Sequence, residues 1–353
     1  MAFPFLQAKG KKRELIVAID LGSHSSKAVQ LQRRGEGFSL LGFSVTEAPK
    51  YEKGFSAAIL AEHLKKVVEP LNLKTKLVTV AISVADALLR NTELPQIPVS
   101  EMRLMLKLNA KNHLQQDLAG YTLDCHIMPP KMEKGPDGVT PASKFKVWVG
   151  GAKQQLVADL QAAIRTAGLI PDQITPAAVG PVNAFELAYP EAFQKDIVAL
   201  VDLGFRNSAI SILNKGELIL NRVVGIGGDK ITMGLAESLG INYAEAEGIK
   251  VGMPTEVESS LQPLLSPLGR DLRTSIDFFE HQADKVVSQV YVSGAASRSD
   301  FMLQALQSEL MAACQKSVAT SAFNLLLPAE QLAQMDQLGP LLTSAVGAAM
   351  TLS

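Results

Sequence analysis

Two stretches of the chain share one pattern of apolar and polar positions. Residues 16–31 and 197–212 each contain an apolar, β-rich run, an Asp-Leu-Gly triplet, a few polar residues and a second apolar run. The pattern predicts two β-hairpins with tight turns. Such turns offer backbone N–H and hydroxyl groups to a phosphate, and Asp20 and Asp202 beside them can hold a cation through water. Because the pattern recurs, it indicates two similar half-domains that face one cleft.

The first hairpin begins a recognisable order of elements. A third strand is predicted over 38–45, a helix over 57–68, where apolar residues have helical spacing, and a buried strand over 76–82. This β-β-β-α-β order is typical of half of a ribonuclease-H-like sheet, the unit that actin-fold proteins repeat. The first half of the chain therefore predicts an α/β fold.

The region from about residue 94 to residue 168 has a different pattern. It starts with a proline-punctuated link and predicts a module in the order helix, strand, strand, helix. The predicted elements are a helix over 100–112, a strand over 122–128, a long loop over 129–143, a strand over 145–149 and a helix over 153–167. We interpret the region as a small α+β module inserted into the first half.

The second half is mostly helical around its hairpin. Residues 254–267, which include Pro263 and Pro267, are expected to form a surface loop. The other predicted elements are a helix that opens within 225–232 and ends near 239, helices over 243–250, 268–286 and 300–311, a strand over 287–292 and a small-residue helix over 343–350.

Composition narrows the classes of function. The 353 residues are 47% hydrophobic and 20% charged with a formal net charge of −1, which is typical of a globular protein and favours no nucleic-acid partner. The length is sufficient for two domains with their own cores. Cys125 and Cys314 lie far apart and predict neither a disulfide framework nor a zinc site, which fits a reducing cytoplasm.

The sequence predicts no transmembrane helix, because the longest apolar stretch, 77–89, is short and interrupted by polar residues. Residues 1–13 carry their basic residues after the apolar ones, which is the reverse of a signal peptide. Two interpretations of this segment stay open. It is a flexible N-terminal arm, or an arm that touches a membrane or a partner through Phe3, Phe5 and Leu6.

With these elements in order, the chain resembles the ATP-binding superfamily that includes actin, sugar kinases and heat-shock chaperones. Within it, the chain most resembles the PilM family of cytoplasmic, actin-like proteins of type IV pilus assembly, which is itself similar to the division protein FtsA. The resemblance extends from about Glu14 to Thr351. It rests on residues 18–23 with Lys27, 200–204 with Ser208, 226–232 followed by 244–250, 292–296 and 345–349.

The resemblance implies an α/β, actin-like (ribonuclease-H-like) fold of two lobes with an inserted α+β subdomain of the FtsA and PilM type. The implied divisions are an N-terminal arm over 1–13, a first lobe over 14–93 and 171–195, the insert over 94–170, a second lobe over 196–339 with a subdomain at about 223–285, and a helix over 340–353 that returns to the first lobe.

The resemblance also implies an ATP·Mg²⁺ site between the lobes. Asp20 and Asp202 would hold Mg²⁺ through water. The phosphates would be bound by Gly22, Ser23, His24, Ser25, Ser26 and Lys27 of one lobe and by Gly204 to Ser208 of the other. The remaining implied residues approach the nucleotide with their backbone (Gly227, Gly228), face the ribose and base (Glu245, Lys250) or leave room for adenine (Gly294, Ala295).

Simpler interpretations of several of these residues stay open. Gly227 and Gly228 can belong to a plain turn, and Glu245 and Lys250 to a solvated helix face. The Lys27 side chain can point to solvent. His24 is expected to fill or line the first turn rather than to act as an acid or base, and the other histidines are too scattered to suggest a metal site.

The chain departs from hydrolytic members of the superfamily, in which a carboxylate or amide orients the attacking water. The corresponding stretch, 174–184, contains no acid, and its polar candidates are Thr175 and Asn183. The second turn carries Phe205 and Arg206 where hydrolytic relatives have smaller residues. The expected behaviour is ATP binding with slow or no turnover.

The implied function is that of a cytoplasmic, ATP-binding scaffold of the type IV pilus platform. It would bind the N-terminal cytoplasmic tail of a PilN-like membrane protein in a groove of the first lobe and insert, form homo-oligomers or a ring, and reach the membrane only through that partner. The alternatives are a small-molecule kinase and an FtsA-like polymer. The chain shows no clear substrate-loop base for a kinase, and it ends after the small-residue helix without the membrane helix expected of FtsA.

Overall fold

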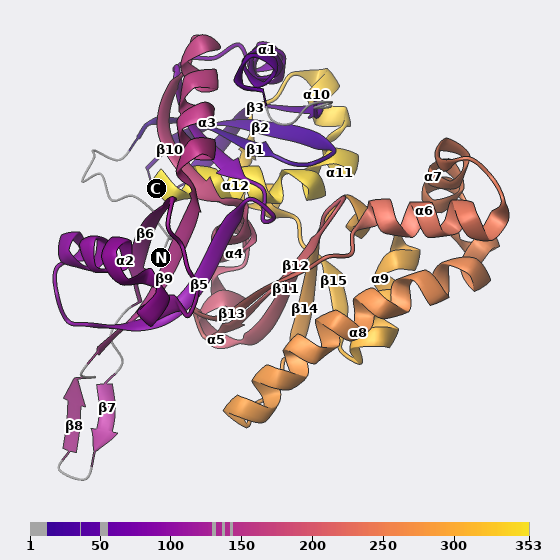
Figure 1. The fold of residues 1–353 in the computed structure, drawn as a ribbon. Coiled ribbons are helices and arrows are strands. Elements are labelled where there is room, and N and C mark those ends of the chain that lie inside the picture. The colour runs from indigo at the N-terminus through magenta and orange to yellow at the C-terminus, as the bar shows by residue number, and fades with distance from the viewer. Residues whose placement is uncertain are drawn as a thin grey trace.

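A six-stranded sheet forms the centre of the first lobe in the computed structural model, which describes residues 13–35, 37–49, 56–128, 132–135, 138–141 and 144–352 (Figure 1). Its strands lie in the order β10-β4-β1-β2-β3-β16. Their bounds are β1 Leu15–Leu21, β2 Ser25–Arg34, β3 Gly37–Glu47, β4 Leu77–Ile82, β10 Ile170–Pro176 and β16 Asn324–Leu325. The predicted hairpin is the antiparallel pair β1–β2, and β4 runs parallel to β1.

Helices cover both faces of this sheet because its strands alternate between two buried sets. Val17 and Ile19 pack with α1 (Ala57–Val68) and α3 (Gln154–Thr166). Ile16 and Ala18 pack with α12 (Thr343–Ala349) on the opposite face. The predicted bounds of the 57–68 helix are confirmed, and Ser56 caps it by accepting a hydrogen bond from the backbone of Ile59.

A five-stranded sheet in the order β13-β12-β11-β14-β15 forms the centre of the second lobe. The strands are β11 Ile197–Leu203, β12 Ser208–Asn214, β13 Glu217–Val224, β14 Gln289–Gly294 and β15 Cys314–Lys316. One face packs on α6 (Gly228–Leu239), α8 (Glu258–Ala283) and α9 (Asp300–Leu310). The other face packs on α4 (Gly180–Ala188) and α5 (Pro190–Lys195).

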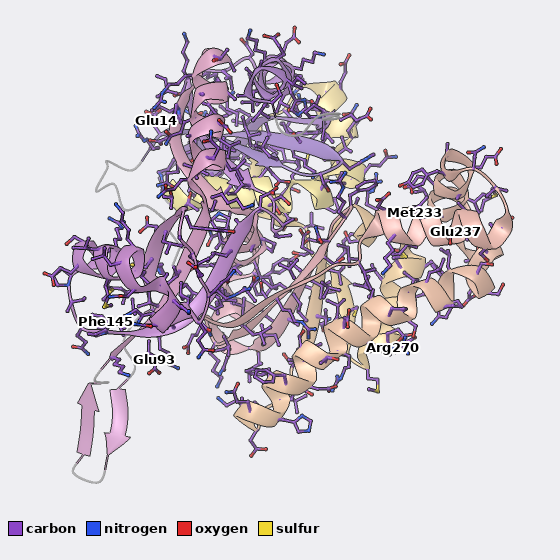
Figure 2. The ribbon with its side chains drawn as sticks, viewed as in Figure 1. Glu14, Glu93, Phe145, Met233, Glu237 and Arg270 are labelled. Atoms are coloured by element: carbon purple, nitrogen blue, oxygen red, sulfur yellow. The ribbon has the colours of Figure 1, made fainter. Side chains whose placement is uncertain are left out.

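The helix α4 also contacts α12 and so links the second lobe to the first. The remaining helices are α7 Tyr243–Gly252, α10 Ala329–Ala333 and α11 Met335–Leu338, with short 3₁₀ helices over Glu69–Leu71, Ala177–Val179, Pro254–Val257, Ala295–Arg298, Ala319–Ala322, Gly339–Leu342 and Met350–Leu352. Figure 2 places Met233 and Glu237 on α6 and Arg270 on α8, away from the first lobe.

The insert is built on a three-stranded sheet in the order β5-β9-β6. Its elements are β5 Ala87–Pro95, α2 Val99–Leu114, β6 Tyr121–Ile127, the hairpin of β7 Met132–Gly135 and β8 Gly138–Pro141, and β9 Lys144–Lys153. The strand β5 is not among the predicted elements. Of the expected link at 94–100, residues 94–95 end β5, residues 96–98 connect it to α2, and residues 99–100 begin α2. Figure 2 shows Glu93 and Phe145 on this insert.

The expectation of a surface loop over 254–267 is wrong. A 3₁₀ helix covers Pro254–Val257, and α8 already begins at Glu258, so that Pro263 and Pro267 lie inside a helix. Leu261, Leu265 and Leu268 are buried at helical spacing, and this packing outweighs the loss of the backbone hydrogen bonds that proline cannot make.

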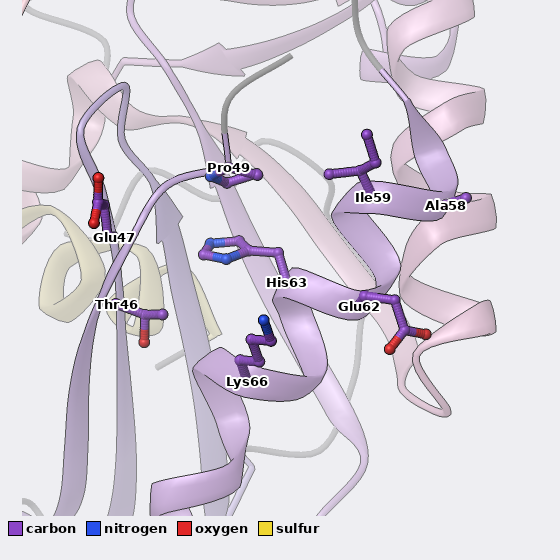
Figure 3. Close-up of a pocket in the computed structure, with 8 residues that line it drawn as sticks. All are labelled: Thr46, Glu47, Pro49, Ala58, Ile59, Glu62, His63 and Lys66. Carbon is purple, nitrogen blue, oxygen red and sulfur yellow. The ribbon is translucent and has the colours of Figure 1, made fainter. Parts of the chain in front are cut away.

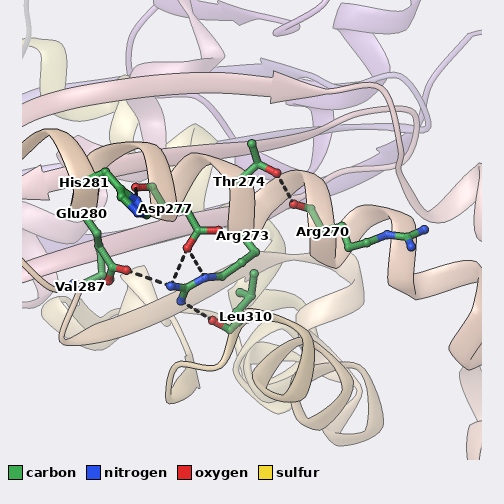
Figure 4. Close-up of polar contacts among 8 residues, drawn as sticks. All are labelled: Arg270, Arg273, Thr274, Asp277, Glu280, His281, Val287 and Leu310. Carbon is green, nitrogen blue, oxygen red and sulfur yellow. Dashed lines mark hydrogen bonds and ion pairs between the residues drawn. The ribbon is translucent and has the colours of Figure 1, made fainter.

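Arg273 fixes α8 against α9 (Figure 4). Its guanidinium donates to Asp277 Oδ1 at 2.7 Å, to Glu280 Oε2 at 2.9 Å and to the carbonyl oxygen of Leu310 at 2.8 Å. The last bond satisfies a carbonyl at the C-terminal end of α9. The cluster is therefore a structural clamp that holds the two helices over the second sheet.

Candidate functional site

The first turn, residues 22–24, connects β1 to β2 and is flanked by a pair of charges. Asp20 and Lys27 lie opposite each other in the ladder, and Lys27 Nζ donates to Asp20 Oδ2 at 3.2 Å. The side chains are only 16% (Lys27) and 9% (Asp20) exposed, so Lys27 does not point to solvent. Lys27 therefore neutralises the charge of the Asp20 carboxylate at the base of the first turn.

The serine side chains of the first hairpin lie in two environments, exposed at the turn and buried below it. Ser23 and His24 are exposed at the turn, and Ser25 is half-buried. Ser26 is buried, and its Oγ lies 2.8 Å from Nε2 of His63 on α1. The predicted phosphate ligands therefore do not form one group, because Ser26 contacts α1 behind the sheet.

The second turn, residues 204–207, connects β11 to β12 and lies beside Asp202, whose contacts differ from those of Asp20. Ser293 Oγ donates to Asp202 Oδ1 at 2.8 Å. Burial raises the pKa of Asp202; the Ser293 hydrogen bond opposes this rise, the charge of Asp20 adds to it and that of Lys27 lowers it. The charges of Asp20 and Lys27 in one lobe thus act on Asp202 in the other lobe.

The start of α6 is packed directly on the second turn. The backbone N–H of Gly228 donates to the carbonyl oxygen of Gly204 at 3.0 Å, and that of Asp229 donates to the carbonyl oxygen of Phe205 at 2.9 Å. A Cβ added at Gly227 would lie 2.3 Å from the Phe205 carbonyl oxygen. Gly227 is thus needed for a close approach of two backbone segments, and the Gly228 N–H is already used within the protein.

Ser208 also serves this contact. Its Oγ donates to the carbonyl oxygen of Ile226 at 2.7 Å, and the side chain is buried. The Ser208 hydroxyl therefore holds the segment before α6 against β12.

The predicted adenine residues lie at the end of strand β14. Gly294 ends β14 opposite Leu203, and Ala295 begins the following 3₁₀ helix.

Glu245 and Lys250 lie in different environments on α7. Asn242 caps this helix, and Glu245 completes a capping box by bonding to the Asn242 backbone. Lys250 Nζ instead donates to Glu247 Oε2 and Thr232 Oγ1, each at 2.6 Å, and to the Gly228 carbonyl oxygen at 3.3 Å. Glu245 therefore has a structural role in capping, whereas Lys250 points toward the glycine segment.

Glu247 is the acidic residue of this helix that the sequence analysis missed. Burial alone would raise its pKa, but hydrogen bonds from Lys250 and Thr232 outweigh burial and hold the pKa below its usual range. The charge of His24 lowers the pKa of Glu247 further. The signal in the sequence was the i, i+3 spacing of Glu247 and Lys250.

The two turns meet through their side chains. The rings of His24 and Phe205 are stacked with centroids 4.4 Å apart and planes inclined by 26°. His24 therefore contacts the opposite lobe. The two turns thus meet through a ring pair, and the Asp20–Lys27 pair, Asp202 and the Glu247–Lys250 pair belong to the segments beside them.

The candidates for orienting an attacking water are buried away from solvent. Asn183 Nδ2 donates to the carbonyl oxygen of Gly347 at 3.0 Å, which joins α4 to α12. Asn183 and Thr175 are 2% and 1% exposed. Asn183 therefore joins α4 to α12, and Thr175 is buried on β10 of the first sheet.

Two pockets lie outside the pair of turns. One of about 540 Å³ lies between the end of β3 and α1, where His63 projects toward Thr46 and Pro49 (Figure 3). Burial lowers the pKa of His63, and the charge of Lys66 lowers it further. The other, of about 630 Å³, lies between the insert and the second lobe, where Trp148 Nε1 donates to the carbonyl oxygen of Leu218 at 3.1 Å.

Over the part of the chain that the structure describes, no group of three or more His, Cys, Asp or Glu side chains forms a metal cluster. The Asp20 and Asp202 pair fits a hydrated Mg²⁺, which needs only one or two protein carboxylates. None of the described helices is long and apolar enough to cross a membrane.

Two lobes, each with a central sheet whose first two strands form a hairpin with an Asp-Leu-Gly turn, and the contact between the two turns are typical of the actin-like fold. A model of the type IV pilus assembly protein PilM family matches residues 18–352, and the chain belongs to this family. A solved PilM-PilN type IV pilus biogenesis complex is similar to the chain with a TM-score of 0.81 and 20% identity, covering 97% of this chain and 100% of the other. The ethanolamine utilization protein EutJ from Carboxydothermus hydrogenoformans matches with a TM-score of 0.55 and 14% identity, over 99% and 92% of the two chains.

Proposed function

We propose that this chain is a nucleotide-binding scaffold of the type IV pilus assembly platform. The observation that carries the nucleotide site is the contact between two glycine-containing turns of separate lobes, with the Asp20–Lys27 pair beside one turn and Asp202 beside the other. Mg²⁺ would be held by the two carboxylates through water, and the phosphates would meet Lys27 and the free backbone N–H groups of the turns. Lys250 and Glu247 would face the sugar.

Turnover is expected to be slow. The side chains of Thr175 and Asn183 are buried, and the stretch 174–184 contains no acid. No carboxylate or amide of this stretch is therefore placed to orient water at a terminal phosphate. The protein would act in its nucleotide-bound state and not through hydrolysis of the nucleotide.

The test is a titration of the purified protein with labelled ATP and Mg²⁺, in parallel with Asp20→Ala and Asp202→Ala. Each substitution is expected to weaken Mg²⁺-dependent binding by about 100-fold, because it removes one of the two carboxylates that hold the cation. Asp336→Ala, which removes an exposed aspartate on α11, is the matched control and should bind as the parent does. Unchanged binding in both cleft variants would refute the site, and rapid ATP hydrolysis lost on Asp202→Ala would refute the slow turnover.

The partner we propose is the N-terminal cytoplasmic tail of a PilN-like membrane protein, held as an extended peptide in a groove of the first lobe and insert. The similarity to the solved PilM-PilN complex supports this partner. Contact with the inner membrane would then come through the partner from the cytoplasmic side, and homo-oligomers or a ring would be formed there. A synthetic peptide of such a tail should bind in a titration, and a scrambled peptide of the same composition should not.

A further inference from the structure

The contact between His24 and Phe205 closes the gap between the two turns at their tips. The ring centroids are 4.4 Å apart, which is stacking contact. A phosphate group with its oxygen atoms is wider than the space between two stacked rings. As long as the rings touch, no phosphate can lie between these two side chains.

The backbone on both sides of this contact is anchored. The carbonyl oxygen of His24 accepts a hydrogen bond from the backbone N–H of Ala48 at 2.8 Å, and that of Phe205 accepts from Asp229 at 2.9 Å. Gly227 packs against the Phe205 carbonyl, so the second turn cannot shift toward α6. The contact therefore opens by rotation of a ring or by separation of the lobes.

The rings of Phe205 and His24 are separate from the polar contacts of the two aspartates. Neither ring takes part in the bond between Lys27 and Asp20 or in that between Ser293 and Asp202. His24 is exposed and lies near the Glu247 carboxylate. Removing either ring thus leaves the carboxylates and the lysine in place, and separates the effect of the rings from that of the cation site.

We propose that the His24–Phe205 stack is a gate that controls how fast a nucleotide enters the phosphate end of the site. The proposal rests on the proposed function, because it concerns the nucleotide site. The closed stack keeps the two turns together without a ligand, and a phosphate chain enters when the rings part. Association of nucleotide is slowed by the need to break the ring contact, whereas a bound phosphate chain already holds the rings apart.

Stopped-flow measurements with a fluorescent ATP analogue and Mg²⁺ on the whole chain test the gate. Phe205→Ala and His24→Ala are expected to raise the association rate constant about 2- to 10-fold, the factor that corresponds to the loss of one aromatic pair, and to leave the dissociation rate constant unchanged. His24→Phe keeps the stack without the imidazole, so its association rate constant should lie closer to that of the parent than to that of His24→Ala. Phe278→Ala, which removes an exposed ring on α8, is the matched control.

A second measurement does not depend on nucleotide binding. In the NMR spectrum of the free protein, the imidazole resonance that His24→Phe removes should shift when Phe205→Ala removes the neighbouring ring current. Parent rates in both alanine variants would overturn the gate and leave the proposed function intact. His24→Phe rates equal to those of His24→Ala would also overturn it, in favour of a charge effect. Absence of nucleotide binding in the parent protein would refute the proposed function and the gate with it, whatever the imidazole shift.

Discussion

The first and second turns have the same Asp-Leu-Gly pattern but compensate their aspartates in different ways. Asp20 lies opposite Lys27 in its hairpin, whereas Asp202 lies opposite Ala209 in the corresponding position. Asp202 instead accepts a hydrogen bond from Ser293 of the parallel strand β14. One carboxylate is thus neutralised by a cation within its own hairpin, and the other has a hydroxyl group as its partner and a pKa that burial raises. A repeated sequence motif is therefore not a repeated electrostatic site.

The largest expected difference is in stability. Asp20→Asn leaves the Lys27 ammonium without its partner in a mostly buried place and should lower the free energy of unfolding by about 2 kcal/mol. Asp202→Asn removes a buried charge and keeps an oxygen that can accept from Ser293, so it should change the free energy of unfolding by less than about 1 kcal/mol. Urea unfolding of the two variants measures this difference. Equal losses in both would contradict the comparison.

The glycines of the two turns should respond alike. A Cβ at Gly204 would lie 2.4 Å from the Asn207 carbonyl oxygen, and one at Gly22 would lie 2.6 Å from that of Ser25. Gly204→Ala and Gly22→Ala should each lower the free energy of unfolding by about 1–2 kcal/mol, because the backbone of the turn must shift. Gly248→Ala on α7, where nothing lies within 4 Å of the added Cβ, is the control for thermal unfolding and should not lower stability. A turn variant as stable as the control would show that the turn relaxes freely.

The pH dependence of stability should distinguish the two aspartates. The folded pKa of Asp202 is raised above its value in the unfolded chain, mainly by burial. Its protonated form therefore stabilises the fold at low pH, and this contribution is lost as the pH rises from about 4 through the raised pKa. The stability of the parent protein relative to Asp202→Asn should fall over that interval in urea titrations at successive pH values. A difference that grows with pH in favour of the parent would be the wrong sign.

The smallest expected effect concerns Ser293. Ser293→Ala removes the hydrogen bond to Asp202 and should lower the free energy of unfolding by about 1 kcal/mol at pH values above the raised pKa of Asp202, where the carboxylate is charged. The cost should become smaller in acid, because the protonated carboxyl needs the donated bond less. Ser288→Ala, an exposed hydroxyl that donates to the Ile197 carbonyl oxygen, is a control whose effect should not depend on pH. A pH-independent cost at Ser293 would show that its hydroxyl acts on packing alone.

The predicted elements that the structure confirms are those that a periodic apolar pattern or a turn or cap within a few residues specifies. The β1–β2 hairpin and the helix over 57–68 have apolar periodicity, a tight turn and a capping serine in the sequence itself. The strand β5 was missed because it pairs with β9, about 55 residues further along the chain, rather than with a neighbour. The start of α8 was missed because two prolines end a helix in isolation, and only burial of its leucine face overrides them.

The two hairpins, their Asp-Leu-Gly turns and the aspartate beside each turn follow from the sequence alone, because each depends on residues close together in the chain. The contacts of those residues depend on the tertiary structure. It assigned Glu245 to a helix cap and Glu247 to the cleft side, since two residues on a helix point in different directions and the sequence does not orient the helix. It also brought His24 to Phe205 across two lobes, a contact that depends on how two separate sheets pack and on no local pattern.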